Sequence, residues 1–390
     1  MRANVIHIIT MLELGGAQEN TIFTVSNLDR EKFQPSLWSG PGGILTEEAK
    51  KLLGQNFEVV PNLIREISPI NDLRALVQLW RMLRLAKKQS KGTPLIIHTH
   101  SSKAGILGRI AGFLAGVPII IHSFHGFGFN DFQPWLVRKA YILAEKIAGL
   151  ITDSFIFVSR ANLQKASQLG IGKPSKYNLI RSGISIDEFK PRQIDILAKR
   201  KELGVGSGKL VVMVSNLKPQ KNPLDFARVA NLVLKKTPDA WFILCGDGEL
   251  RPELERMIED FGIKDRVKLL GWRRDIPEIL WASDLLILTS LWEGLPRVYP
   301  QAMASGLAIV GTRVDGGPEA VIDGENGYLL EPGDYQGISQ RVIELLEDDE
   351  KRKKMGQRGM EMVAEFDIHK MVKDQEQLYQ RLLKEKNLWN

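Results

Sequence analysis

Two stretches of the sequence bring glycine or lysine to points where a strand should give way to a helix. Gly15 and Gly16 stand in such a turn, where backbone amides are able to approach an anion at the positive end of a helix. Lys218 and Lys221 occupy a second loop, where an ammonium group near a helix start suits a phosphate. Taken alone, the first stretch also fits a plain tight turn and the second a solvated loop.

The strongest single feature is the segment 290–301, Ser-Leu-Trp-Glu-Gly-Leu-Pro-Arg-Val-Tyr-Pro-Gln, which directly follows an apolar run at 285–288. It places Glu293 at a strand end, and Gly294 and Leu295 continue the loop with backbone amides. A carboxylate followed by such amides and then a helix offers hydrogen-bond partners to a polyhydroxylated ligand. A glutamate that only caps the following helix is the structural alternative, and we favour the ligand site.

The elements that must position these residues are short apolar runs of strand length, separated by longer amphipathic segments. This alternation predicts parallel βαβ units and an α/β fold. The first half contains expected strands at 5–9, 35–38, 58–60, 95–98, 119–123, 155–158 and 177–180. The second half contains expected strands at 210–215, 241–245, 267–270, 285–288, 308–311 and 327–330.

Two such series predict two Rossmann-like, doubly wound domains facing each other across a cleft. We expect the first domain over 1–188 and the second over 189–367, with a final helix over 368–390 that packs back on the first domain. Ligands of open α/β sheets bind at the carboxyl ends of the strands, which makes the cleft the expected site. No Gly-x-Gly-x-x-Gly spacing opens either domain, so a nicotinamide dehydrogenase is disfavoured.

The composition is that of a globular enzyme of 390 residues, with 44% apolar and 25% charged residues. Cys245 is the only cysteine, which excludes an intramolecular disulfide and favours a reducing, cytoplasmic location. The uncharged run 110–130 is broken by glycine and proline, so we expect a helix end, a turn and a strand there. The N-terminus reads as a buried strand and not as a secretion signal.

Charge is distributed unevenly along the chain. Residues 1–190 carry 23 basic and 14 acidic side chains, whereas residues 191–390 carry 30 and 32. A basic first half suits an anionic membrane, a nucleic acid, a charged substrate or simply solvent. The basic residues are not interleaved with stacking aromatics, which disfavours nucleic acid.

Taken in order and spacing, seven motifs resemble those of family-4 retaining glycosyltransferases of the GT-B fold, over essentially the whole chain. They are Gly-Gly-Ala-Gln at 15–18, His-Thr-His-Ser-Ser-Lys-Ala-Gly at 98–105, Arg-Ser-Gly-Ile-Ser-Ile-Asp at 181–187, Lys-Pro-Gln-Lys at 218–221, Cys-Gly-Asp-Gly-Glu at 245–249, Leu-Gly-Trp at 270–272 and the Glu293 segment. Overall, the chain is similar to bacterial enzymes that build capsule, O-antigen or exopolysaccharide.

The resemblance implies that the second domain binds a nucleotide-diphosphate sugar and that the first presents the acceptor. Lys218 and Lys221 would neutralise the diphosphate, which Gly16 would approach from the first domain. Glu293 would contact the donor sugar, and backbone groups near Trp272 and Arg273 would hold the base.

The sequence departs from the family pattern at two positions. Gln301 stands where the family usually has a second glutamate that contacts the ribose, and Asn216 stands where it usually has an arginine. The ribose contact would then be made by a neutral amide, and Lys218 is the plausible substitute for the missing charge. Both changes bear on donor affinity and on the identity of the nucleotide.

His125 follows an expected strand of the first domain, and the glycines at 126 and 128 favour its exposure. A histidine at this position lies beside the donor sugar in the family, so we expect His125 to have a catalytic role, ahead of His98, His100 and His122. A satisfied core histidine is the structural alternative.

The expected reaction transfers a hexosyl or N-acetylhexosaminyl group, with retention, from a UDP-sugar to a glycan or lipid-linked acceptor. Fixed positive groups would stabilise the departing diphosphate. There is no Asp-x-Asp in the chain, so we expect neither a metal nor a cofactor. A GT-B nucleotide-sugar epimerase and a non-catalytic sugar-nucleotide-binding subunit are the alternatives.

A segment of the first half suggests contact with anionic lipid at the inner face of the cytoplasmic membrane. Basic residues at 65, 74, 81, 84, 87, 88 and 91 surround an apolar set at helical spacing. This set consists of Leu73, Leu76, Val77, Trp80 and Leu83. A solvated helix is the alternative.

Overall fold

The computed structural model describes residues 2–389 and divides into two compact units. Unit 1 is Met1–Gly183 together with Ile368–Asn390, and unit 2 is Ile184–Asp367. The boundary lies five residues before the one expected from the sequence. Its position follows from two contacts of Ile184, which donates its amide to the Phe366 carbonyl at 2.9 Å and forms a parallel bridge with Asp367.

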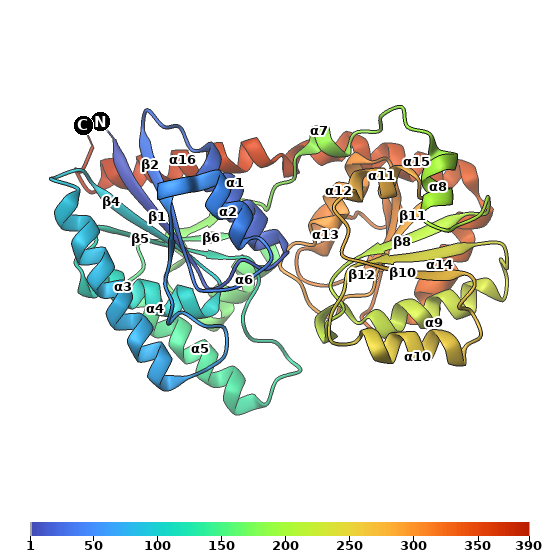
Figure 1. Cartoon of the computed structure of the whole chain (residues 1–390), viewed down its shortest axis with the longest axis horizontal. Coiled ribbons are helices and arrows are strands. Elements are labelled where there is room, and N and C mark those ends of the chain that lie inside the picture. Colours follow the sequence, from blue (N-terminus) through green and yellow to red (C-terminus); the bar gives the residue numbers. More distant parts are fainter. Residues whose placement is uncertain (1, 390) are drawn as a thin grey trace. The chain divides into compact units, whose positions relative to one another are not determined.

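Unit 1 is built on a seven-stranded parallel sheet with the order β3-β2-β1-β4-β5-β6-β7 (Figure 1). Each expected strand is present. The strands are β1 Ala3–Ile9, β2 Phe33–Ser39, β3 Phe57–Val59, β4 Leu95–His100, β5 Ile119–Phe124, β6 Ser154–Phe157 and β7 Tyr177–Leu179.

Helices cover both faces of this sheet, which explains why its strands read as continuous apolar runs. Successive strand residues point to opposite faces. Val5 and Ile96 pack in one core cluster with Tyr379, whereas Ile6 and Ile97 pack in another. The helices are α1 Gly16–Asn27, α2 Thr46–Leu53, α3 Pro69–Gln89, α4 Ser102–Leu114, α5 Trp135–Leu150, α6 Arg160–Leu169 and α16 Ile368–Glu385.

The C-terminal helix α16 belongs to unit 1. Met371, Leu378 and Leu382 are buried in one cluster with Ile119 and Ile121 of β5. Unit 1 is therefore built from two separate stretches of the chain, and its core includes side chains of α16.

Unit 2 is built on a six-stranded parallel sheet with the order β10-β9-β8-β11-β12-β13. Each expected strand is again present. The strands are β8 Leu210–Val214, β9 Trp241–Cys245, β10 Val267–Gly271, β11 Leu285–Leu288, β12 Ala308–Thr312 and β13 Gly327–Leu330. The helices are α7 Ile186–Phe189, α8 Ile196–Glu202, α9 Pro223–Leu234, α10 Arg251–Asp260, α11 Ile276–Trp281, α12 Val298–Ala304, α13 Gly317–Ala320, α14 Tyr335–Glu347 and α15 Asp349–Met362.

The uncharged run 110–130 has the structure expected of it. Helix α4 ends at Leu114, Gly116 turns the chain with a φ of 67°, and β5 begins at Ile119. Among the described residues 2–389, no helix is both long and apolar enough to cross a lipid bilayer.

Both sheets reverse their winding at one place, β1/β4 in unit 1 and β8/β11 in unit 2. At such a switch point, the loops after the two central strands diverge to opposite faces and leave a crevice at the carboxyl ends. The loops after β1, β4, β8 and β11 are therefore where the topology predicts ligand sites.

Candidate active site

In unit 2, the switch point brings together the lysine and the glutamate singled out in the sequence. Lys221 comes from the loop after β8 and Glu293 from the loop after β11, and their side chains form an ion pair. The side chains are only 17% and 7% exposed. A charged pair removed from water in this way must be held by further hydrogen bonds to be tolerated, and those bonds are present.

Three neighbours hold Glu293 in place. Ser290 donates its hydroxyl to Glu293 Oε1 at 2.7 Å, and the Glu293 amide donates to Asp315 Oδ2 at 2.8 Å. Gln220 donates its amide to the Trp292 carbonyl at 3.0 Å, which ties the two loops to each other. These contacts fix the direction of the carboxylate. A glutamate that serves as a helix cap would instead accept from the amides of α12, so the capping alternative finds no support in these contacts.

Sequence reasoning missed Asp315 as part of this site. It comes from the loop after β12, the strand next to β11, and its backbone has a φ of 40°. Left-handed backbone at a residue other than glycine is uncommon and gathers at functional sites. The signal available in the sequence was the Asp-Gly-Gly at 315–317 directly after a predicted strand.

The loop after β8 carries the other polar groups expected to meet a diphosphate. Lys218 begins the 3₁₀ turn Pro219–Lys221 and is half-buried. Among residues 2–389, the buried Oδ1 of Asn216 and the buried Oγ of Ser215 have no hydrogen-bond partner. Buried polar atoms are normally satisfied, so this loop contains two polar atoms that lack the usual partner.

The residues expected at the nucleotide base lie at the end of β10. The Trp272 side chain is 44% exposed, as a surface for stacking requires. Arg273 is engaged by carboxylates, donating to Asp275 at 2.6 and 2.7 Å and to Glu202 at 2.6 Å. The hydrogen bonds of Arg273 hold the pKa of Asp275 well below its usual range. Because the guanidinium is already paired with these carboxylates, a nucleotide base would have to bind to backbone groups here.

The remaining expected residues of unit 2 continue from Glu293. Gly294 and Leu295 are buried, and the Gly294 carbonyl accepts from the Gly316 amide at 2.9 Å. Gln301 lies on α12 and is half-buried. Tyr299 is fully buried. Its burial, and to a smaller extent the negative charge of Glu293, raise the pKa of its hydroxyl.

In unit 1, the switch point opens on a cavity of about 740 Å³. Its polar side is formed by the loops after β1 and β4, and its apolar side by α4 and α5. The lining includes Thr10, Met11, Glu13, Gln18, Arg65, Asp72, Ser101, Ser102, Lys103, Ile106, Leu107, Val137, Ala140, Tyr141 and Ala144. This volume and this mixture of walls are typical of small-molecule sites.

Two ion pairs line this cavity, joining Arg65 to Glu13 at 2.6 Å and Lys103 to Asp72 at 2.7 Å. Ser101, also in the lining, has a left-handed φ of 58°, and its hydroxyl lies 2.7 Å from that of Thr10. Sequence reasoning did not single out Thr10, since nothing in its local spacing indicates that it meets Ser101.

The expected glycines lie at the same switch point. Helix α1 begins at Gly16. A side chain on Gly15 would meet Gln18 Oε1 at 3.0 Å, closer than an ordinary contact. The N-terminal amides of α1 thus lie beside the cavity residue Gln18, as an anion site at this turn would require.

His125 lies at the end of β5, where Gly126, with a φ of 137°, turns the chain. The side chain is half-buried, and its Nε2 lies 3.0 Å from Nδ1 of His100. His98, His100 and His122 are at most 3% exposed, whereas His125 is half-buried.

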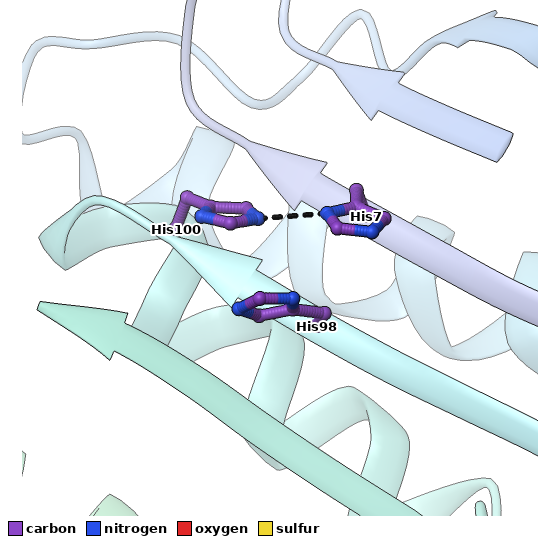
Figure 2. Close-up of side chains that lie close together, drawn as sticks. All are labelled: His7, His98 and His100. Atoms are coloured by element: carbon purple, nitrogen blue, oxygen red, sulfur yellow. Dashed lines mark hydrogen bonds between the residues drawn. The ribbon is translucent and has the colours of Figure 1, made fainter. Parts of the chain in front are cut away.

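His7, His98 and His100 form a cluster in which ring nitrogens lie within 4.8 Å of one another (Figure 2). The facing nitrogens of His7 and His100 are 2.9 Å apart in rings inclined by only 9°, so they are directed at each other. Ligands of one metal instead direct their lone pairs at a common third point. The nitrogens of His98 contact Tyr379 at 2.6 Å and Ser123 at 2.7 Å. The geometry is that of a hydrogen-bonded cluster.

Two Rossmann-like units, one with a lysine–glutamate pair at its switch point and one with a cavity there, define a nucleotide-binding enzyme of the GT-B fold. Residues 14–188 match the family described as Glycosyltransferase Family 4, and residues 195–362 match that described as Glycosyl transferases group 1. A curated relative from Escherichia coli is 34% identical over 89% of both chains. The chain therefore belongs to the family-4 glycosyltransferases.

That Escherichia coli relative is described as UDP-Gal:alpha-D-GlcNAc-diphosphoundecaprenol alpha-1,3-galactosyltransferase. A Campylobacter jejuni relative, N,N'-diacetylbacillosaminyl-diphospho-undecaprenol alpha-1,3-N-acetylgalactosaminyltransferase, is 26% identical over 80% of this chain and 84% of its own. The crystal structure of Anabaena HepE in complex with UDP-glucose is 25% identical, with a TM-score of 0.81 over 97% of this chain and 99% of that one.

Proposed function

We propose that this glycosyltransferase moves a hexosyl or N-acetylhexosaminyl group from a UDP-sugar to a glycan or lipid-linked acceptor, with retention of configuration, in capsule or lipopolysaccharide synthesis. The buried ion pair of Lys221 and Glu293 at the switch point of unit 2 carries the proposal. The names of the two bacterial relatives and the UDP-glucose in HepE support the choice of donor and acceptor.

Unit 2 binds the donor in this proposal. Lys218 and Lys221 neutralise the diphosphate, the Ser215 hydroxyl donates to the same ligand, and the Asn216 Oδ1 accepts from one of the ligand's hydroxyls. The exposed face of Trp272 stacks on the base, and backbone groups at Arg273 hydrogen-bond its edge. Gln301 contacts the ribose.

The sugar lies at Glu293, whose carboxylate accepts from its hydroxyls while Gly294 and Leu295 supply backbone groups. Gly15 and Gly16 approach the diphosphate with the N-terminal amides of α1, and His125 contacts the sugar. The fixed charges matter most as the bond to the anomeric carbon lengthens, because negative charge then builds on the diphosphate. We expect no metal in this step, and the leaving phosphate takes the proton of the acceptor hydroxyl.

The acceptor binds in the cavity of unit 1. Arg65 and Lys103 in its lining suit an anionic acceptor such as a lipid diphosphate, each exchanging its present carboxylate partner for it. The apolar wall of α4 and α5 suits the lipid or the ring faces of a glycan.

Contact with an anionic membrane belongs to this proposal, and we move the surface assigned to it from α3 to α5. In the apolar set of α3, Leu83 is fully buried and Leu76 and Trp80 are partly buried against the same core, whereas Leu73 and Val77 are 62% and 36% exposed. Helix α5 instead exposes large apolar side chains, from 55% to 79%, beside the cavity. They are Trp135, Leu136, Leu143, Ile147 and Leu150.

Incubation with a panel of UDP- and GDP-sugars and a polyprenyl-diphosphate sugar acceptor tests the reaction. We expect UDP release that requires the acceptor, and a product whose anomeric configuration by NMR matches that of the donor. Inversion would contradict the retaining mechanism. An isomerised donor without acceptor would indicate an epimerase instead, and tight donor binding without turnover would indicate a non-catalytic subunit. Full activity in excess EDTA is expected if no metal takes part.

Vesicle sedimentation tests the membrane contact. We expect binding that grows with the fraction of anionic lipid and that falls in L136E and I147E, because a charge on α5 would have to enter the interface. The matched control is L197E, an equally drastic change at a 75% exposed leucine of unit 2. Equal loss in this control would contradict a role for α5.

A further inference from the structure

A continuous line of hydrogen bonds runs through unit 1 from the C-terminal helix to His125. The Tyr379 hydroxyl lies 3.5 Å from His7 Nε2, and His7 Nδ1 lies 2.9 Å from His100 Nε2 (Figure 2). His100 Nδ1 lies 3.0 Å from His125 Nε2. Residues from α16, β1, β4 and the end of β5 thus form one connected line, which we call the histidine chain.

The inner histidines of this chain are neutral. Burial lowers the pKa of His7 to about 3 and that of His100 well below 6.5. A neutral imidazole has one N–H and one accepting nitrogen. If His7 donates from one side, it must accept on the other, and the same holds for His100. All links of the histidine chain therefore point in one direction.

The hydroxyl of Tyr379 decides that direction. It has a single proton, and two acceptors lie closer to it than His7 does: His98 Nδ1 at 2.6 Å and Gln375 Oε1 at 3.3 Å. With the proton on either of these bonds, the Tyr379 oxygen is an acceptor toward His7. His7 then has its proton on Nε2 and accepts at Nδ1 from His100 Nε2–H, whose Nδ1 in turn accepts from His125.

We propose that Tyr379, His7 and His100 are positioning residues that hold His125 as the Nε2–H tautomer, with Nδ1 presented as the hydrogen-bond acceptor. This rests on the proposed function for its consequence. His125 then accepts from a hydroxyl of the donor sugar and does not donate to the departing diphosphate. The reverse direction would present an N–H instead, so the buried end of the chain determines which contact His125 makes.

The tautomer is measurable without any substrate. In full-length protein labelled with ¹⁵N at histidine, long-range ¹H–¹⁵N spectra distinguish protonated from unprotonated ring nitrogens, and the six histidines give few signals. The H125Q spectrum identifies those of His125. We expect the wild-type protein at pH 8 to show His125 with Nε2 protonated and Nδ1 unprotonated. An Nδ1–H tautomer, or an equal mixture of both, would overturn the proposal.

Variants remote from the substrate then test whether the buried end of the histidine chain determines the tautomer of His125. Y379F removes the hydroxyl that accepts from His7 at the buried end of the histidine chain. We therefore expect both His125 tautomers to appear and kcat to fall about 10-fold at nearly unchanged KM. The matched control is Y177F, which removes a hydroxyl that bonds to the Ile171 carbonyl at 2.6 Å in the same unit. Y177F should change neither the tautomer nor kcat.

H100F interrupts the chain in the middle and should have the same effect as Y379F on the His125 signals. An unchanged tautomer in folded Y379F would contradict the proposal, even if activity fell. If H100F fails to fold, the wild-type and Y379F spectra still decide. Absence of sugar transfer by the wild-type protein would overturn the proposed function, but it would leave the tautomer result intact, so the two failures are distinguishable.

Discussion

The switch points of the two units share one topology and differ in charge and in space. At β8/β11, Lys221 and Glu293 form a buried ion pair that neighbouring side chains hold in place. At β1/β4, hydroxyls and the two partly exposed ion pairs of Arg65 with Glu13 and Lys103 with Asp72 line a cavity of about 740 Å³. The comparison teaches that this topology places a site and that the residues after the strands decide its chemistry.

The two units also differ in their histidine content. Unit 1 contains all six histidines of the chain, and unit 2 contains none. Four of them, His7, His98, His100 and His122, are buried, and burial lowers the pKa of each below 6.5. Arg109, which is itself buried beside Glu145, lowers the pKa of His122 further. Unit 1 is therefore the part of the molecule that mild acid should destabilise.

The largest expected effect is this loss of stability in acid. The unfolded chain takes up protons near pH 6.5, whereas folded His7 does so only near pH 3, so the stability is present above pH 6.5 and lost as the pH falls toward 3. At pH 5.5 the loss is roughly 1 kcal/mol for His7, and the other three buried histidines act in the same direction. Hydrogen exchange at pH 7.5 and 5.5, corrected for intrinsic rates, should show lost protection in unit 1 alone.

A pair of variants sharpens this test. H7F removes one buried imidazole and should flatten the pH dependence of unit 1, whereas H369Q changes an exposed histidine and should leave it unchanged. Equal loss of protection in both units at pH 5.5 would show that the buried histidines are not its cause.

The next effect concerns the charged site of unit 2. E293Q keeps the shape of the side chain and removes the charge that pairs with Lys221, so we expect kcat to fall by about 100- to 1000-fold. The control is D349N, which breaks the pairing of Asp349 with Lys209 in the same unit. A coupled assay for released UDP measures both. Activity of E293Q within a few-fold of the wild type would remove Glu293 from the reaction.

The cavity of unit 1 gives the third effect. A140W places an indole in the cavity, and the misfit should cost about 2 kcal/mol of acceptor binding, or roughly a 30-fold rise in the acceptor KM. L150W, at the 79% exposed end of the same helix, is the control. The slow hydrolysis of donor in the absence of acceptor should be unchanged in both. An unchanged acceptor KM in A140W would place the acceptor elsewhere.

The strands could be predicted from the sequence, but the contacts between side chains far apart in the sequence could not. Strands of parallel sheets covered on both faces are continuous apolar runs, and each expected run is a strand. Local spacing, however, does not indicate that Tyr379 reaches His7 or that Thr10 meets Ser101. The sequence also does not tell which residues of the apolar stripe of α3 face the core, because leucines that face a core and leucines that face lipid have the same helical period.

The smallest effect compares one exposed tryptophan from each unit. Trp272 is 44% exposed at the expected base site and Trp135 is 62% exposed on α5. Loss of stacking in W272A should raise the KM for the UDP-sugar roughly 10-fold with little change in kcat, since the base is remote from the reacting bond. W135A should leave that KM unchanged and weaken vesicle binding instead. If W135A raised the KM for the UDP-sugar and W272A weakened vesicle binding, Trp135 would contact the nucleotide and Trp272 the lipid surface, contrary to the proposal.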